Sequence, residues 1–132
     1  MHRDSVISID MGGTKVLGCV VNSKEGIIAS VKKPTDPTVS RNKYVHQLAE
    51  IIFELIEEVH VNKKKIKAVC LGVPGLVNPH TGVIGLAPNL GLKNFNIKKS
   101  LEAEIPFPVL IENDVNLGAL GIKTFGVGKK AK

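Results

Sequence analysis

Hydrophobic and polar positions in the first third of the chain follow a pattern that predicts three short strands. The apolar-rich segments run over about Val6–Asp10, Val16–Val21 and Ile27–Lys32, and turn residues such as glycine and asparagine separate them. Parallel strands need a long crossover, and these connections are too short for one. The three segments are therefore expected to form an antiparallel meander.

A long amphipathic helix is predicted next, over about Arg41–His60. Apolar side chains recur there at helical spacing at Tyr44, Leu48, Ile51, Leu55 and Val59. A stripe of this width is typical of a helix that packs on a sheet. Ser40 precedes the helix and is placed to cap its N-terminus.

The near-continuous apolar run Ile66–Val73 predicts a strand that is buried on both faces. Beyond it, residues 76–96 are rich in glycine and proline, and only Val83–Leu86 is expected to form a short strand or hairpin arm. A short helix over Ile97–Glu104 and a strand over Pro108–Glu112 follow. These features predict two further strands of the main sheet.

The last element is a glycine-containing helix expected over Asn116–Phe125. The whole order is then three strands, a helix, a strand, a helix, a strand and a helix. Right-handed crossovers place the later strands beside the first. The sequence therefore predicts an α/β fold in which a mixed five-stranded sheet carries helices on its faces, the layout of a ribonuclease H-like domain of the actin/hexokinase type.

Composition narrows the classes of function. The 132 residues suit a single domain, and the net charge of +6 raises the question of a nucleic-acid partner. However, the lysines cluster at 63–65, at the end of the predicted helix, and at the C-terminus, without interleaved aromatic residues. We expect solvated basic edges and no nucleic-acid partner.

The two cysteines and four histidines show no spacing typical of metal ligands. No signal peptide and no apolar run of membrane-spanning length is evident in the sequence. The expectation is a cytoplasmic protein without a membrane partner.

The segment Asp10-Met11-Gly12-Gly13-Thr14-Lys15 joins the first two predicted strands. Because a strand follows it, the segment is neither a P-loop nor a dinucleotide fingerprint, both of which lead into a helix. Glycine can take positive φ in such a turn and lets backbone N–H groups approach a phosphate closely. Asp10 could hold Mg²⁺, usually through water. An ordinary hairpin turn is the alternative interpretation.

Two further polar features also follow predicted strands: Pro74-Gly75 and Asn113-Asp114. Ligands bind outside the carboxyl ends of parallel strands in open α/β sheets, so these features and Asp10 are expected at one edge. Phosphoryl transfer to a sugar needs a base for the hydroxyl proton, and Asp114 is a candidate. The Asn113 amide can donate to and accept from a sugar hydroxyl.

Structural interpretations of these residues remain open. Asp114 could instead cap the following helix, and Pro74-Gly75 could be a simple strand-ending turn. Asn89 could be a turn asparagine, and Glu112 could be an edge charge or a partner of the site residues.

Four segments in this order resemble the ROK family (repressor, open reading frame, kinase), and most closely its glucokinase-like sugar kinases. They are Asp10–Lys15, Leu71–Pro79, Ala87–Leu90 and Glu112–Asn116. The resemblance implies ATP- and Mg²⁺-dependent phosphorylation of a hexose at its 6-hydroxyl by a cytoplasmic homodimer.

Site residues are carried over from the resemblance position by position. Asp114 matches the catalytic base of the family. Gly75, Asn89 and Asn113 match sugar-contacting residues. The first phosphate motif corresponds to Asp10, Gly12, Gly13, Thr14 and Lys15.

Members of the family are longer and continue into a second phosphate motif, further sugar ligands and a cysteine–histidine zinc cluster. We therefore expect residues 1–132 to be an N-terminal kinase domain that does not turn over substrate alone, with structural zinc only in the missing C-terminal domain. A sugar-responsive transcription regulator of the same family and a non-catalytic sugar-binding module are the alternatives. The identity of the sugar is left open.

Overall fold

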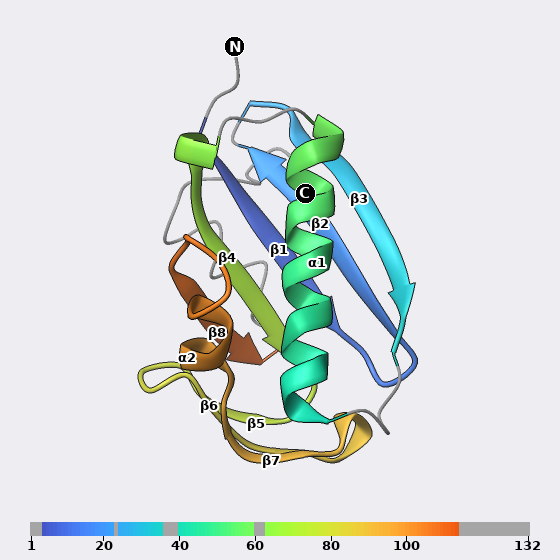
Figure 1. The fold of residues 1–132 in the computed structure, drawn as a ribbon, viewed down its shortest axis with the longest axis vertical. Coiled ribbons are helices and arrows are strands. Elements are labelled where there is room, and N and C mark those ends of the chain that lie inside the picture. The colour runs from blue at the N-terminus through green and yellow to red at the C-terminus, as the bar shows by residue number, and fades with distance from the viewer. Residues whose placement is uncertain (1–3, 23, 36–39, 60–62, 114–132) are drawn as a thin grey trace.

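The structure, a computed structural model, describes residues 4–22, 24–35, 40–59 and 63–113. They form a five-stranded sheet in the order β3-β2-β1-β4-β8 and a three-stranded sheet in the order β5-β6-β7 (Figure 1). The main sheet consists of β1 (Ser5–Met11), β2 (Lys15–Asn22), β3 (Gly26–Pro34), β4 (Ile66–Val73) and β8 (Val109–Asn113). The remaining elements are α1 (Arg41–Val59), η1 (Lys63–Lys65), β5 (Leu76–Asn78), β6 (Val83–Ala87), η2 (Pro88–Leu90), β7 (Leu92–Asn96) and α2 (Ile97–Glu102).

The predicted mixed sheet is confirmed. Strands β1, β2 and β3 pair antiparallel as a meander, whereas β4 pairs parallel with β1 and β8 pairs parallel with β4. The connections that contain α1 and α2 supply the long crossovers that parallel pairing requires.

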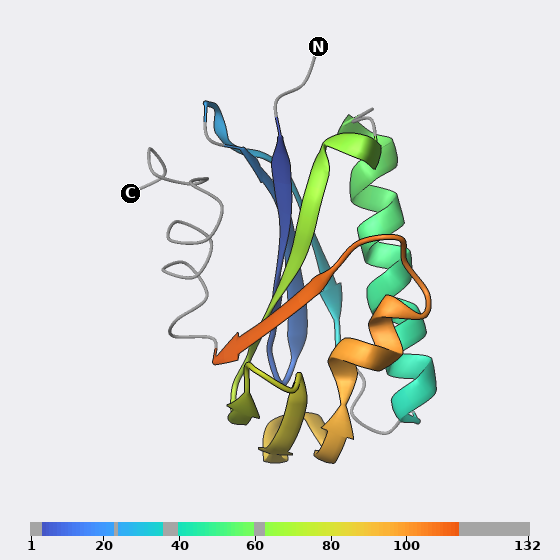
Figure 2. The ribbon, with the colours of Figure 1, turned by 90° about the vertical axis from the view of Figure 1, so that its left-hand side faces the viewer.

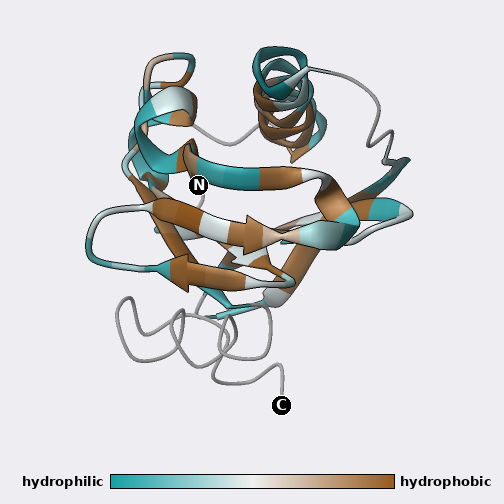
Figure 3. Cartoon of the chain, turned by 90° about the horizontal axis from the view of Figure 1, so that it is seen from below, coloured by the Kyte–Doolittle hydropathy of each residue, from teal (hydrophilic) through white to brown (hydrophobic). Residues whose placement is uncertain are grey.

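Both helices lie on one face of this sheet (Figure 2). The apolar stripe of α1 is buried against the sheet, and its polar side faces outward, as an end-on view of the helix shows (Figure 3). Gly18 permits close packing, since a Cβ there would lie 3.1 Å from side-chain atoms of both Ile51 and Leu55. The helix starts as predicted, because the backbone N–H of Lys43 donates to Ser40 Oγ at 3.2 Å.

Strand β4 is buried on both faces, as its apolar run predicted. Every residue of the strand except Lys67 is buried. On the side away from α1, Cys70 and Val6 form a small second cluster with the partly buried Val21 and Leu110.

Residues 76–96 differ from the expectation. Instead of one short strand among loops, they form the whole second sheet, which lies at the lower end of the molecule (Figures 1 and 2). Its strands are three to five residues long, too short to show a clear alternation. Turns at Gly82 (φ 78°) and Gly91 (φ 66°) separate them, which explains the glycine content that suggested loops.

Smaller differences concern segment ends. Lys63–Lys65 do not end α1 but form the separate turn η1 directly before β4, and α2 stops at Glu102 rather than Glu104. The helix predicted over 116–125 lies outside the described residues. Among the helices that the structure describes, none is long and apolar enough to cross a membrane.

Candidate functional site

The three polar features that follow strands come together at one edge of the main sheet, as predicted. Strands β1, β4 and β8 run parallel and in register, with Asp10 beside Gly72 and Gly72 beside Glu112. Val73 pairs with Asn113 one position later. Asp114 follows Asn113 directly but lies outside the described residues, so its two interpretations stay open.

The hairpin between β1 and β2 is closed by a hydrogen bond of 2.9 Å from the backbone N–H of Gly12 to the carbonyl oxygen of Lys15. Neither Gly12 nor Gly13 takes positive φ in this turn. Space is the reason for glycine: a Cβ on Gly12 would lie 2.7 Å from the Lys15 carbonyl oxygen. The closure also engages the Gly12 amide, so the phosphate-binding candidates are the amides of Gly13 and Thr14 and the Thr14 hydroxyl.

Gly13 brings the hairpin against the turn η2. A Cβ on Gly13 would lie 3.2 Å from Cβ of Asn89, so the two segments pack closely at this point. Leu90, with only 1% of its surface exposed, anchors η2 in the core. The structure thus places Asn89 beside the glycine hairpin.

Gly75 continues the same cluster. A Cβ there would lie 2.3 Å from the backbone oxygen of Leu86 and 2.9 Å from Cα of Ala87, so the turn after β4 presses directly on β6. The side-chain amide of Asn113 donates to the Gly75 carbonyl oxygen at 3.2 Å. These contacts join the hairpin, η2, β6, the turn at Gly75 and the end of β8 into one continuous set.

Thr35 is a residue of this region that the sequence analysis missed. Its Oγ1 donates to the carbonyl oxygen of Gly12 at 3.0 Å, and its backbone N–H donates to the carbonyl oxygen of Thr14 at 2.9 Å. Thr35 directly follows β3, and a contact 23 positions away leaves no local pattern in the sequence. It supports the hairpin from the side of β3.

Two carboxylate side chains, Asp10 and Glu112, lie at this edge of the main sheet. Asp10 is exposed on the face away from α1, and burial together with the Asp10 charge raises the pKa of the neighbouring Cys19 thiol. Glu112 Oε1 accepts a 2.9 Å hydrogen bond from the backbone N–H of Asn113. Glu112 therefore acts as a partner that orients the last residue of β8.

The described residues fit a magnesium ion held in the usual way for phosphate chemistry. No group of three or more His, Cys, Asp or Glu side chains with the geometry of a metal cage occurs within the described part of the chain. Mg²⁺ keeps several waters and needs only one or two carboxylates besides the phosphates of a substrate. Asp10, exposed near the end of β1, is the candidate carboxylate for such an ion.

Known proteins resemble this chain over nearly its whole length. The model of the ROK family matches residues 6–132. The chain is 33% identical over 123 residues to a glucokinase of Streptomyces coelicolor, which covers 93% of this chain and 37% of that protein. It is also 32% identical over 121 residues to a putative xylose repressor of Caldicellulosiruptor sp., covering 92% of this chain and 30% of that protein.

A solved structure shows the same fold. The ROK family glucokinase of Streptomyces griseus, determined in complex with glucose and AMPPNP, superposes with a TM-score of 0.77 at 28% identity, covering 95% of this chain and 38% of that one. The chain thus spans less than two fifths of the length of these relatives. The predicted actin/hexokinase-like fold class is confirmed, and with a family model matching nearly its whole length, the chain belongs to the ROK family.

Proposed function

We propose that this chain is the N-terminal domain of an ATP-dependent sugar kinase of the glucokinase type, which phosphorylates the 6-hydroxyl of a hexose. The observation that carries the proposal is the contact between the glycine hairpin and η2, where a Cβ on Gly13 would lie 3.2 Å from Cβ of Asn89. This contact puts a phosphate-binding candidate directly beside a sugar-binding candidate. Phosphoryl transfer requires that proximity, because positioning and charge stabilisation supply most of the catalysis.

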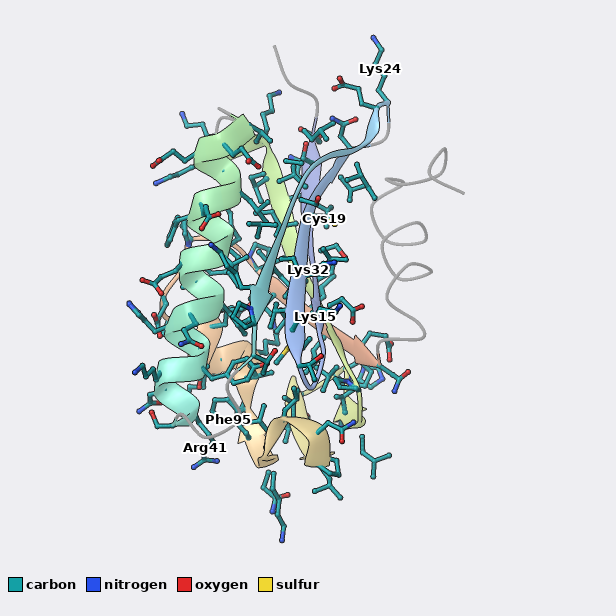
Figure 4. All side chains as sticks on the ribbon, turned by 90° about the vertical axis from the view of Figure 1, so that its right-hand side faces the viewer. Lys15, Cys19, Lys24, Lys32, Arg41 and Phe95 are labelled. Atoms are coloured by element: carbon teal, nitrogen blue, oxygen red, sulfur yellow. The ribbon has the colours of Figure 1, made fainter. Side chains whose placement is uncertain are left out.

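In the proposed reaction the amides of Gly13 and Thr14 and the Thr14 hydroxyl bind phosphate oxygens of ATP. Asp10 holds the waters of the metal site, and Lys15, exposed at the start of β2 (Figure 4), adds positive charge near the phosphates. Mg²⁺, when bound, neutralises the charge that develops on the transferred phosphoryl group.

The sugar binds at the edge of the main sheet that carries Gly75 and Asn113, with Asn89 contributing from η2. Asn113 has two amide donors and one acceptor oxygen, and its hydrogen bond to Gly75 fixes the orientation of the amide plane toward the sugar. Asp114 then accepts the proton of the 6-hydroxyl. The sugar oxygen forms the new bond to the γ-phosphorus as the bond from that phosphorus to the ADP oxygen breaks.

The remainder of a protein of family length would supply the second wall of the ATP site. Closing two domains around substrates excludes water and completes such sites, so we propose that residues 1–132 alone do not turn over substrate. We further propose a cytoplasmic homodimer for the complete protein, with structural zinc in the C-terminal domain.

A sugar-responsive transcription regulator is the second candidate. The observation that favours it is the 32% identity to a putative xylose repressor, nearly the same as the identity to the glucokinase. In that case the same edge would bind sugar without transferring phosphate. A non-catalytic sugar-binding module would behave in the same way in an activity assay.

A coupled ADP-release assay with ATP, Mg²⁺ and a panel of hexoses tests the proposal on this chain and on a form extended to the length of its relatives. We expect hexose-dependent ADP release from the longer form only, and its loss in Asp114→Asn. Asp4→Asn is the matched control, since it makes the same chemical change at an exposed residue that pairs with Lys67 at 3.6 Å, before β1 and away from the site. A folded longer form that binds sugar but releases no ADP would contradict the kinase and favour the regulator.

A further inference from the structure

The turn of the glycine hairpin carries one of the two bonds that can close it, from the Gly12 N–H to the Lys15 carbonyl oxygen. The reciprocal bond, from the Lys15 N–H to the Gly12 carbonyl, is common in β-turns but does not occur within the described residues. The Gly12 carbonyl accepts instead from Thr35 Oγ1 at 3.0 Å. A hydroxyl 23 positions away therefore takes the place of the local turn bond.

Thr35 makes a second bond to the same hairpin. Its backbone N–H donates to the carbonyl oxygen of Thr14 at 2.9 Å, which extends the pairing of β2 and β3 by one position beyond Lys15. The two bonds of Thr35 therefore reach the carbonyl groups of Gly12 and Thr14, which lie on either side of the Gly13–Thr14 peptide group. A rotation of this central peptide group strains at least one of them.

Peptide planarity links the Thr35 hydroxyl to the N–H of Gly13. The Gly12 carbonyl and the Gly13 N–H belong to one peptide group, and in a trans peptide the oxygen and the hydrogen point in opposite directions. Because Thr35 holds the Gly12 oxygen toward itself, the Gly13 N–H points away from Thr35. Within the part of the chain that the structure describes, neither this N–H nor that of Thr14 donates to a protein acceptor, so both can bind an anion.

The Thr35 side chain is itself held in place by α1. Burial raises the pKa of the Tyr44 hydroxyl on α1 to about 12, and the side-chain interaction with Thr35 acts in the opposite direction, so the two side chains are neighbours. Thr35 is also partly buried, and the branched Cβ of threonine restricts χ1. The hydroxyl is therefore preorganised to bond the Gly12 carbonyl.

We propose that Thr35 is a positioning residue of the phosphate site. Its hydroxyl fixes the peptide group between Gly12 and Gly13, so that the N–H groups of Gly13 and Thr14 face a phosphate of the nucleotide. The inference rests on the proposed function, since it takes the anion to be a phosphate of ATP. Thr35 does not touch the ligand, and it acts only through the hairpin.

Amide NMR titrations of the 132-residue chain with Mg·ATP test the proposal. Thr35→Val keeps the shape of the side chain and the backbone bond to Thr14 but loses the hydroxyl, whereas Thr35→Ser keeps the hydroxyl. Mg·ATP should shift the amide signals of Gly13 and Thr14 saturably in the wild type. The Kd should rise by about three- to tenfold in Thr35→Val, the worth of one neutral hydrogen bond, and stay near the wild-type value in Thr35→Ser. Thr81→Val is the matched control, since it makes the same chemical change at an exposed residue between β5 and β6.

A spectroscopic signature separates positioning from a mere loss of stability. The chemical shifts of the Gly12 carbonyl carbon and the Gly13 amide nitrogen report on the hydrogen bond that their shared peptide group accepts. Without ligand, both signals should move in Thr35→Val and return close to their wild-type positions in Thr35→Ser. A variant that was only less stable would unfold at a lower urea concentration without moving these two signals in its folded state.

Phosphoryl transfer by the form extended to the length of its relatives gives a second readout. The KM for ATP should rise in Thr35→Val by a factor similar to that of the Kd. The KM for the hexose should not change, because Gly75 and Asn113 are held by contacts that do not include Thr35.

Three results would overturn the role of Thr35: no saturable shifts at Gly13 and Thr14 in the wild type, an equal Kd in the wild type and Thr35→Val, or a Kd in Thr35→Ser as high as in Thr35→Val. The first needs only the wild type, so it applies even where a variant folds poorly. None of the three depends on turnover. A longer form that releases no ADP contradicts the kinase, and the titrations still decide the role of Thr35. ADP release combined with an unchanged Kd in Thr35→Val contradicts the role of Thr35 alone.

Discussion

The side-chain amide of Asn113 donates a hydrogen bond of 3.2 Å to the backbone carbonyl of Gly75, across 38 positions of sequence. The bond joins the ends of β4 and β8, which lie side by side in the main sheet. Gly75 in turn presses on the backbone of β6. The end of β8, where Asp114 follows, is thereby held in register with the second sheet and with Asn89 beyond it.

Gly75→Ala should destabilise the fold and disturb this junction. The new Cβ would lie 2.3 Å from the Leu86 oxygen, and because the obstacle is backbone, β6 must shift, at a cost of about 1–3 kcal/mol. Urea unfolding measures the change. Gly85→Ala is the control in the same sheet, since a Cβ there meets its nearest atom at 3.5 Å, an ordinary contact. Equal losses in the two variants would contradict the proposed clash.

Leu90→Ala tests what positions Asn89. Leu90 is 1% exposed, and removing its side chain should lower the free energy of unfolding by about 2–5 kcal/mol. Leu86→Ala is the matched comparison. Leu86 is 42% exposed, so this change should lower the free energy of unfolding much less. Shifts of the Asn89 side-chain amide in NMR spectra should accompany Leu90→Ala alone; their absence would mean that η2 is held by other contacts.

Tyr44 should make stability depend on alkaline pH. Its pKa is about 12 in the folded chain, against 10.0 as the ordinary value, so folding favours the protonated form. This contribution is complete below pH 10 and is lost as the pH rises toward 12, by about 2–3 kcal/mol. Denaturant unfolding from pH 9 to 12 should show a steeper loss for the wild type than for Tyr44→Phe. Parallel curves would show that the hydroxyl reaches water before it ionises.

The two thiols should react at very different rates. Burial raises the pKa of Cys70 to about 12, and only 1% of Cys70 is exposed. Iodoacetamide should therefore modify it only on unfolding. Cys19, partly exposed, should react first.

Asp10→Asn tests whether the charge of Asp10 contributes to the raised pKa of the Cys19 thiol. Burial and then the Asp10 charge raise the pKa of this thiol, so removing the charge should speed its modification at pH 8. Mass spectrometry of timed samples resolves the order. An unchanged Cys19 rate would indicate that burial alone controls it.

Glu102 should stabilise the start of β8 in a pH-dependent way. Its Oε2 accepts from the backbone N–H of Val109 at 2.8 Å and from Lys98 Nζ at 2.6 Å. Burial opposes ionisation, but these bonds and the Lys98 charge outweigh it and lower the pKa below the ordinary 4.5. The contribution is present above pH 4.5 and disappears as the pH falls through the folded pKa.

Glu102→Gln should accordingly remove stability at pH 7 and make unfolding less sensitive to acid between pH 5 and 3. About one third of the side chain is exposed, so solvent screening keeps the loss to about 1 kcal/mol. Glu57→Gln, an exposed change on α1, is the control that should leave both properties unchanged. If the stability of Glu102→Gln fell between pH 5 and 3 as steeply as that of the wild type, other carboxylates would be responsible for the acid dependence.

Local patterns in the sequence were sufficient for the main sheet. The alternation in β2 and the unbroken apolar run of β4 follow from which faces are buried, and the stripe of α1 follows from helical periodicity. The convergence of Asp10, Gly75 and Asn113 at one edge also followed, because parallel strands align their carboxyl ends. The second sheet could not be predicted from the sequence, because its strand β5 has only three residues, too few to show an alternation of buried and exposed positions.

The sequence by itself determined the family, the order of the main strands and the residue types at the strand ends, because these depend on neighbours along the chain. Only the tertiary structure placed Gly13 close to Asn89, so that a Cβ on Gly13 would lie 3.2 Å from Cβ of Asn89. It alone also placed Thr35 against the hairpin and buried the Tyr44 hydroxyl. Those properties depend on distances between segments far apart in the chain, which no local pattern records.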